Sequence, residues 1–339
     1  MERYLEENFG GVQAKNSEEE ALDRWRRPAL GSASLAVVNH KLRVAVHVSK
    51  AALQFIYDLS PRDNAQSGTS LFQPSQWKRG DHIGSGSFGH VHLGVNSENQ
   101  ELCAIKEVNL AYSCTKEQLE QLKQEIHVLS QLTHHNIIQY YGSNMSDDAI
   151  SIYIEYAPNG SIQKFLSDNG GPLKEPMIRD YTAQILSGIA YLHQRKIVHR
   201  DIKGANILVG LDGVVKLADF GMAKHVSSFA GAHSMKGTVY WMAPEVILGP
   251  QSDKGYNGAV DIWSLGCTVI EMATARHPWH PLEPVQAMFR IAVKKDTPQI
   301  PDTLSDEGKS FLQLCFNHDP ATRPTAIQLM DHPFVREFA

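Results

Sequence analysis

Three glycines in the stretch IGSGSFGHV have a spacing that suits the binding of a phosphate group. Gly84, Gly86 and Gly89 are followed by Val91, which gives the pattern G-x-G-x-x-G-x-V. A hairpin without side chains here could lie over a nucleotide and present backbone N–H groups to its phosphates. Any tight hairpin can use three glycines, so a purely structural role stays open. Because the glycines lie between two strand patterns, they argue against a dinucleotide-binding fold, which needs a strand followed by a helix.

After these glycines, the sequence CAIK places a lysine inside an apolar strand pattern. Lys106 follows Ala104 and Ile105, and burial of its ammonium group without a partner would cost free energy. Its natural partners are phosphate oxygens and a carboxylate on a neighbouring helix. Glu125 is such a carboxylate, because it precedes Ile126 near the inward face of a predicted helix. The alternative is that Lys106 and Glu125 are two solvated charges.

Three further motifs, IVHRDIKGANILV, KLADFG and WMAPE, follow in this order. Their key residues are His199, Arg200, Asp201, Lys203 and Asn206 in the first, Asp219, Phe220 and Gly221 in the second, and Ala243, Pro244 and Glu245 in the third. They match the patterns H-R-D-x-x-x-x-N, D-F-G and A-P-E. Together with the glycines and the strand lysine, these motifs make residues 77–339 resemble a eukaryotic protein kinase.

The resemblance implies an α+β fold with two lobes. A small, antiparallel, β-rich lobe with one key helix would cover residues 77–155, and a larger, mainly helical lobe would cover residues 160–339. The implied enzyme is a serine/threonine protein kinase that uses ATP and Mg²⁺. An inactive scaffold of the same fold would be expected to lack Lys106, Asp201 or Asp219, and all three are present.

Each motif residue has a role in phosphoryl transfer that the resemblance implies. Asp201 accepts or orients the proton of the substrate hydroxyl group, and Lys203 meets the γ-phosphate, as in kinases that act on serine or threonine. Asn206 and Asp219 supply the hard oxygen ligands that Mg²⁺ prefers. Lys106 pairs with the α- and β-phosphates and is itself held by the helix carboxylate named above.

The resemblance also places adenine between the two lobes. Ala104 would lie above the base and Leu208 below it, Ile154 would be the gatekeeper, and the backbone of Glu155 and Ala157 would make the polar contacts. Packing in the core is the alternative role for the apolar members of this set. The further ATP-binding residues that the resemblance implies are Ile83, Gly84, Gly86, Gly89 and Val91.

Four residues match positions that support the family's fold. Asp261 in VDIWSLG and Arg323 in ATRPT are expected to be structural, as is Arg200. Arg323 is expected to pair with Glu245 and not to contact the substrate.

The segment between the D-F-G and A-P-E motifs contains hydroxyl side chains that could control activity. Arg200 precedes the catalytic aspartate, and kinases with arginine there commonly require a phosphate on this segment. We expect Ser234 to be the activating site, phosphorylated by an upstream kinase or in trans by a second copy, with Ser227 and Ser228 as weaker candidates. Thr238 is expected to belong to the shelf that binds the substrate peptide.

Several stretches narrow the resemblance to the plant mitogen-activated protein kinase kinase kinases of the MEKK type. They are HHNIIQYYGS, EYAPNGSIQKFL, VHRDIKGANILV and SMKGTVYWMAPEVI. This subfamily implies MAP kinase kinases as protein substrates. Two departures are visible, because Val239 stands where proline is usual and His92 where tyrosine is common.

The periodicity of apolar residues predicts the elements that position these motifs. Strands are expected at 91–93, 102–108 and 149–156, helices at 115–132 and 177–194, and a fully buried helix at 262–273. A β-rich part followed by a helical part indicates two lobes with a cleft between them.

Composition excludes several other classes of protein. The 339 residues carry a formal net charge of −5, which argues against a nucleic-acid partner, and no stretch approaches the roughly 20 apolar residues of a transmembrane helix. The start MERYLEENFGG is too acidic for a secretory signal. Four cysteines without CxxC spacing argue against a zinc ribbon and for reduced thiols, so we expect a cytoplasmic location.

Residues 1–59 differ from the remainder. The first 76 residues carry no net charge, and residues 60–76 have the composition of a linker. Within residues 1–59, the blocks MERYLEENFGGVQAKNSEEEALDRWRR and KLRVAVHVSKAALQFIYDL resemble the N-terminal autoinhibitory segment of plant autoinhibited calcium-transporting ATPases. In that family a basic segment between the blocks binds calmodulin, whereas here PALGSASLAVVNH has no lysine or arginine. The missing basic residues argue against calmodulin binding. The likeness still makes a calcium/calmodulin-responsive regulatory or scaffold protein with a kinase-like domain the alternative function.

Overall fold

A computed structural model describes residues 72–86, 89–109, 116–146, 149–225, 239–249 and 257–336. The chain divides into two units, Met1–Lys50 and Ala51–Ala339, and all the described residues belong to the second unit. The predicted segment 1–59, Cys114, Ser227, Ser228, Ser234 and Thr238 lie outside the described residues.

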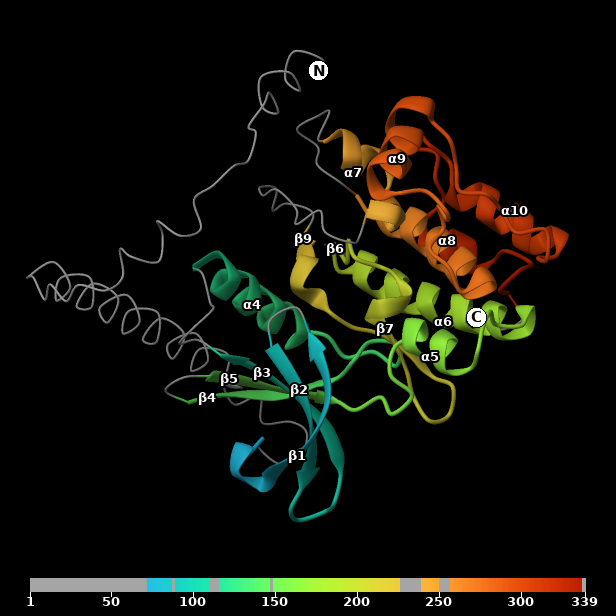
Figure 1. The fold of residues 1–339 in the computed structure, drawn as a ribbon. Coiled ribbons are helices and arrows are strands. Elements are labelled where there is room, and N and C mark those ends of the chain that lie inside the picture. Colours follow the sequence, from blue (N-terminus) through green and yellow to red (C-terminus); the bar gives the residue numbers. More distant parts are fainter. Residues whose placement is uncertain are drawn as a thin grey trace, which may run out of the picture. The chain divides into compact units, whose positions relative to one another are not determined.

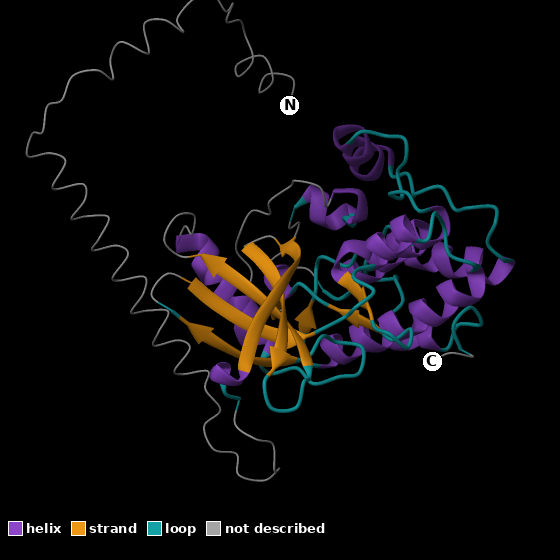
Figure 2. Cartoon of the chain, turned by 60° about the horizontal axis from the view of Figure 1, so that its bottom comes forward, coloured by secondary structure: helices purple, strands orange, loops and turns teal. Residues whose placement is uncertain are grey.

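The β-rich part is an antiparallel sheet, as the sequence predicts, but it has five strands where the sequence predicts three. Its strands are β1 (Trp77–Gly86), β2 (Gly89–Asn96), β3 (Leu102–Asn109), β4 (Tyr140–Met145) and β5 (Ala149–Glu155). Their order is β1-β2-β3-β5-β4, which places β3 at the centre. Figure 1 shows helix α4 (Lys116–Leu129) beside this sheet, and Figure 2 shows the strands gathered at one end and most helices at the other.

Strand register sets which side chains share a face of the sheet. Lys106 on β3 lies opposite Val91 on β2 and opposite Ile152 on β5. Residues directly opposite each other in antiparallel strands point to the same side. The two central neighbours of Lys106 are therefore apolar, which removes water from its aliphatic stem and leaves its ammonium group dependent on partners outside the sheet.

The other face of the sheet has its own small apolar cluster. Cys103, Ile105 and Tyr153 are buried there, with Phe72 and Trp77 packed against them. The rings of Phe72 and Tyr153 lie 5.0 Å apart. The end of the predicted linker, from Phe72 onward, is thus packed on the sheet.

The helical part surrounds α8 (Ala259–Thr274), whose residues from Ala259 to Met272 are all buried. The fully buried helix predicted over 262–273 is therefore present, although it begins three residues earlier than predicted. The other helices and short elements here are α5 (Ile162–Asp168), α6 (Glu175–Gln194), β6 (Ile197–Val198), η3 (Gly204–Asn206), β7 (Ile207–Val209), β8 (Val215–Leu217), η4 (Phe220–Met222), β9 (Lys224–His225), η5 (Val239–Trp241), α7 (Pro244–Leu248), α9 (Pro284–Phe289), η6 (Arg290–Lys294), α10 (Asp306–Cys315) and α11 (Ala326–Met330), with η2 (Pro74–Gln76) preceding the sheet.

Two further helix boundaries differ from prediction. Helix α4 ends at Leu129 and not at residue 132, because the chain tightens: the N–H groups of Gln131 and Leu132 donate to carbonyls only three residues earlier. Helix α6 begins at Glu175, two residues early. Pro176 fits its first turn, where a missing N–H costs nothing, and Glu175 complements the positive end of the helix dipole.

Two glycines of the predicted phosphate-binding pattern differ in what surrounds them. A Cβ atom added to Gly89 would lie 1.9 Å from the backbone oxygen of Glu107, whereas one added to Gly84 meets nothing within 4 Å. Gly89 is therefore required by the packing of β2 on β3. Among the residues that the structure describes, none demands glycine at position 84.

We expect Gly89→Ala to lower the free energy of unfolding by about 2 kcal/mol, because the added carbon collides with backbone. Gly84→Ala is the matched control and should change it by less than about 0.5 kcal/mol. Urea unfolding of both variants measures the difference. Equal stabilities would show that the hairpin absorbs the added carbon without cost.

Candidate active site

The lysine of the central strand forms an ion pair with the helix that covers the sheet. Lys106 Nζ lies 2.7 Å from Glu125 Oε1, and both residues are buried. The pairing expected from the sequence is therefore confirmed, and the solvated alternative is wrong. Burial alone would lower the pKa of Lys106, but the carboxylates of Glu125 and Asp219 raise it above its ordinary value. Three charged groups from three elements thus converge.

A second cluster of polar side chains lies on the loop between β6 and β7. Lys203 Nζ donates to both carboxylate oxygens of Asp201, at 2.9 and 2.8 Å. Asn206 Nδ2 donates to the backbone oxygen of Asp201 at 2.9 Å and to its Oδ2 at 2.7 Å. The Asp201 carboxylate is thereby held in one orientation, while Oδ1 of Asn206 is left to bind another group.

This loop depends on a carboxylate of the buried helix α8. Asp261 accepts hydrogen bonds from the backbone N–H of His199 at 2.9 Å and of Arg200 at 2.7 Å, and from His193 Nε2 at 2.8 Å. Arg200 has a φ of 71°, which is left-handed backbone that a non-glycine residue adopts only when its surroundings impose it. Burial alone would raise the pKa of Asp261, but these hydrogen bonds and the two imidazoles hold it below its ordinary value.

Asp219 is held beside the same loop. It also has left-handed backbone, with a φ of 59°, and it precedes η4. The N–H of Ala218 donates to the backbone oxygen of Asn206 at 2.9 Å, and the backbone oxygen of Ala218 lies 3.1 Å from His199 Nε2. The structure therefore brings Asn206 and Asp219, the two predicted metal ligands, onto neighbouring backbone.

The residues predicted to surround adenine come from both lobes. Ala104 is buried and pairs across the sheet with Ile154, and Leu208 lies on β7. The N–H of Glu155 donates to the backbone oxygen of Gln139, so only its carbonyl remains for a polar contact with a ligand. The carbonyl of Ala157 accepts from Gly160, which leaves the N–H of Ala157 for that purpose.

The rest of the predicted ATP-binding set lies on the hairpin of β1 and β2. Ile83 on β1 is exposed, Val91 on β2 is half-buried, and Gly86 pairs with Gly89 across the hairpin. No cluster of three or more His, Cys, Asp and Glu side chains is arranged to hold a metal ion in the described part of the chain. Among those same residues, no helix is both long and apolar enough to span a bilayer.

Comparison with known proteins decides the family. Residues 77–335 match the family model for the protein kinase domain, which is most of the chain. The chain belongs to the protein kinase family. The two-lobed α+β fold predicted from the sequence is confirmed by this match and by the sheet and helices described above.

The curated relatives of this kinase include three proteins of Arabidopsis thaliana. It is 56% identical over 264 residues to "Mitogen-activated protein kinase kinase kinase 3", covering 77% of this chain and 43% of that protein. It is 56% identical over 278 residues to "Mitogen-activated protein kinase kinase kinase YODA", covering 81% and 31%. With "Mitogen-activated protein kinase kinase kinase 5" the identity is 52% over 267 residues, covering 77% and 37%. The chain spans less than half the length of these relatives.

The ion pair predicted to stabilise the helical lobe of the kinase, between Arg323 and Glu245, is present. Arg323 NH1 lies 2.8 Å from Glu245 Oε1, and its NH2 lies 3.3 Å from Oε2. Arg323 NH1 also donates to the backbone oxygen of Ala259 at the start of α8. The expected Arg323–Glu245 pair is confirmed, and it ties α7 to α8. Cys103, Cys267 and Cys315 are buried free thiols.

One residue that supports the candidate site, Glu271, is not predicted by any sequence motif. Glu271 on α8 is buried, and its Oε2 accepts from the backbone N–H of Gly204 at 2.9 Å and from Trp241 Nε1 at 3.1 Å. It thus joins the loop that carries Asp201 and Lys203 to η5. Burial raises the pKa of Glu271 to about 7. The available signal was a glutamate inside a helix that the sequence predicts to be fully buried, because a buried carboxylate needs partners.

Glu271 should make stability depend on pH. Its pKa rises from 4.5 in the unfolded chain to about 7 in the fold, so its contribution is full below 4.5 and is lost as the pH rises through about 7. Between pH 4.5 and about pH 8, the free energy of unfolding of the wild type should fall by about 3 kcal/mol more than that of Glu271→Gln. The glutamine oxygen can accept both hydrogen bonds, so the variant should fold.

Urea unfolding at a series of pH values measures this difference. Glu101→Gln, which changes an exposed carboxylate of the sheet lobe, is the control and should follow the wild type. Identical pH profiles for the wild type and Glu271→Gln would contradict the raised pKa.

Proposed function

We propose that this kinase transfers the γ-phosphoryl group of ATP to serine or threonine residues of MAP kinase kinases. The observation that carries the proposal is the arrangement around Asp201. Its carboxylate is oriented by Lys203 and Asn206, beside Asp219, while Lys106 and Glu125 are paired within electrostatic reach of Asp219. Phosphoryl transfer needs this kind of positioned charge and no covalent intermediate.

The residues present fit ATP and Mg²⁺. Mg²⁺ usually takes one or two protein oxygens and completes its shell with phosphates and water. The carboxylate of Asp219 and Oδ1 of Asn206 would hold it, and such a site does not require a cluster of three acidic side chains. When bound, ATP supplies the phosphoryl group that is transferred. The paired ammonium group of Lys106 would bind phosphate oxygens, which explains why a charge is kept on the inner face of the sheet.

The chain's own residues would then act on the substrate hydroxyl. Asp201 would accept or orient its proton. Hydrogen bonds already hold both of its carboxylate oxygens in one orientation, which keeps them in place for this role. Lys203 lies against that carboxylate and would also face the transferring phosphate, where positive charge stabilises the transition state. The pair thus places a proton acceptor and a cation at one point.

The proposed place of this kinase in a MAP kinase cascade is supported by its relatives. The three named above are mitogen-activated protein kinase kinase kinases, and their printed names support MAP kinase kinases as the substrates of this chain. Because the chain spans less than half their length, substrate choice and partners are part of the proposal.

The test is phosphorylation of a panel of purified MAP kinase kinases. Wild type should label at least one of them, and Lys106→Met should reduce the rate by about a hundredfold or more, because it removes a preorganised charge. Lys164→Met is the matched control: this exposed lysine also pairs with a carboxylate, that of Asp168 on α5, and its loss should leave the rate within about twofold. Transfer by the wild type no faster than by Lys106→Met would contradict the proposal.

We also propose that Ser234 is the activating phosphorylation site, supplied by an upstream kinase or in trans by a second copy. The support is its place between the D-F-G and A-P-E motifs and the arginine, Arg200, before Asp201. A phosphate there would add charge that a guanidinium group can bind and so order the segment.

Ser234→Ala should therefore lower activity by about fivefold or more. Mass spectrometry should find a phosphate on Ser234 of the active wild type. Ser227→Ala and Ser228→Ala are the controls and should retain activity. Full activity of Ser234→Ala, with no phosphate on the segment, would rule out this site.

The remaining proposals rest on sequence alone. They are a cytoplasmic location, a peptide shelf that includes Thr238, and the likeness of residues 1–58 to the autoinhibitory segment of calcium-transporting ATPases. Calmodulin binding follows only from that likeness. The family match begins at residue 77, and no observation favours the calcium-responsive alternative over the kinase.

A further inference from the structure

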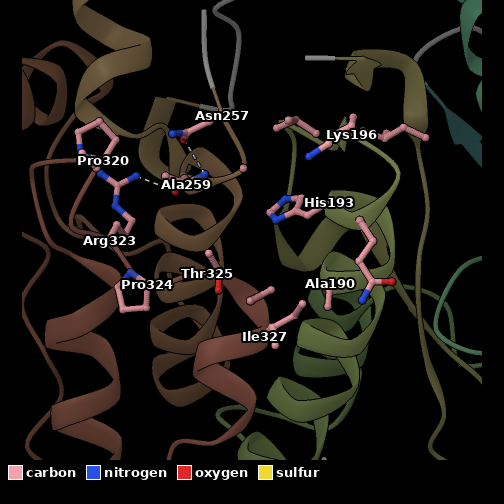
Figure 3. A pocket seen from close by; sticks show the side chains of 16 residues that line it. Ala190, His193, Lys196, Asn257, Ala259, Pro320, Arg323, Pro324, Thr325 and Ile327 are labelled. Atoms are coloured by element: carbon pink, nitrogen blue, oxygen red, sulfur yellow. Dashed lines mark hydrogen bonds between the residues drawn. The ribbon is translucent and has the colours of Figure 1, made fainter. Parts of the chain in front are cut away.

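A cavity of about 400 Å³ lies in the helical lobe, away from the residues proposed to bind ATP. Figure 3 shows its two walls. One wall is the end of α6 and the start of β6, with Ala190 and His193 facing the gap, and the other is the start of α8 and α11, with Ala259 and Ile327. Its volume is in the range of pockets that hold small organic molecules.

The lining combines apolar surface with positive charge. Its charged or titratable members are His193, Lys196 and Arg323, and no carboxylate lines the cavity among the described residues. The guanidinium group of Arg323 is already used by Glu245, Ala259 and Asn317. Lys196 is exposed at the mouth and forms no ion pair with any described residue. The ammonium group of Lys196, which is the one charge of the lining not paired with a described residue, therefore complements an anion.

The backbone conformation of Lys196 also indicates that its side chain has a function. This residue follows the end of α6 with a φ of 60°, a left-handed conformation that glycine or asparagine adopts at lower cost at this position. Strained non-glycine residues persist where the side chain has a use. Within the described protein, the ammonium group of Lys196 has no ion-pair partner that would supply that use.

The cavity wall also reaches the catalytic loop through one side chain. His193 Nε2 contacts Asp261 Oδ2, and Asp261 holds the backbone of His199 and Arg200. A Cβ atom on Gly258 would lie 2.5 Å from the His193 ring, so the ring is fixed against α8. A molecule that moves His193 would thus act on the loop that carries Asp201.

We propose that this cavity binds a small free molecule with an apolar body that ends in a carboxylate. The apolar body lies between Ala190 and Ile327, and the carboxylate lies at the mouth beside Lys196. An apolar body alone would leave the charge of Lys196 unmatched, and a much larger ligand would exceed the volume of about 400 Å³.

Decanoate is the probe, titrated into the purified full chain by isothermal calorimetry. Lys196→Gly should weaken its binding about tenfold, because it removes the charged partner of the carboxylate. The same change relieves the left-handed strain, so the variant should be at least as stable as the wild type. Lys295→Gly is the matched control, since Lys295 is also left-handed, with a φ of 56°, but lies outside the cavity lining.

Two further measurements separate the apolar and the ionic parts of the site. Ile327→Trp should abolish binding by filling the cavity, whereas Leu211→Trp, at another exposed apolar position, should not. Methyl decanoate should bind the wild type about as weakly as decanoate binds Lys196→Gly. The proposal would be overturned if the wild type did not bind decanoate. It would also be overturned if Lys196→Gly and Ile327→Trp bound decanoate within twofold of the wild-type affinity, or if the wild type bound the acid and the ester equally well.

Discussion

The active site depends on a single buried carboxylate. Asp261 accepts the backbone N–H groups of His199 and Arg200, and without it both donors would lose their partners in the interior, at a cost of about 1–3 kcal/mol each. It also holds Arg200 in left-handed backbone, which sets the direction in which the chain enters Asp201. The orientation of Asp201, the proposed catalytic residue, therefore depends on the backbone of Arg200 and on the α8 carboxylate that holds it.

A second constraint joins the two lobes through charge. Lys106 belongs to β3, Glu125 to α4 and Asp219 to the loop before η4, and both carboxylates stabilise the charged form of the lysine. Oε2 of Glu125 is buried and accepts no hydrogen bond from the described residues. Because a buried charge is costly without its partner, displacement of α4 or of Asp219 would weaken the position of Lys106. Electrostatics thus makes the sheet, its helix and the helical lobe interdependent.

Much of this arrangement was predictable from sequence, because its signals are local. Alternation and apolar periodicity predict the strands around Lys106 and the buried helix α8, and the motifs predict which polar residues meet. The features that the sequence does not predict depend on contacts between residues distant in sequence. The hydrogen-bond partners of Glu271, for example, lie 67 and 30 positions away. The end of α4 and the left-handed backbone of Arg200 were also missed, since tertiary contacts and not residue preference impose them. The steric reason for Gly89 appears only once β3 lies beside it.

Helix α8 explains how so short a loop can be held so firmly. Asp261 and Glu271 are ten residues apart on it, about 15 Å at the rise of an α-helix. Asp261 binds the start of the loop at His199 and Arg200, and Glu271 binds it again at Gly204. Asp201 and Lys203 lie between these two points, on a segment held at both ends of one rigid helix. Since hydrogen bonds keep the pKa of Asp261 low while burial raises that of Glu271 to about 7, only the first attachment keeps its full charge near neutral pH. The loop therefore has one attachment whose carboxylate stays charged near neutral pH and one whose carboxylate titrates there.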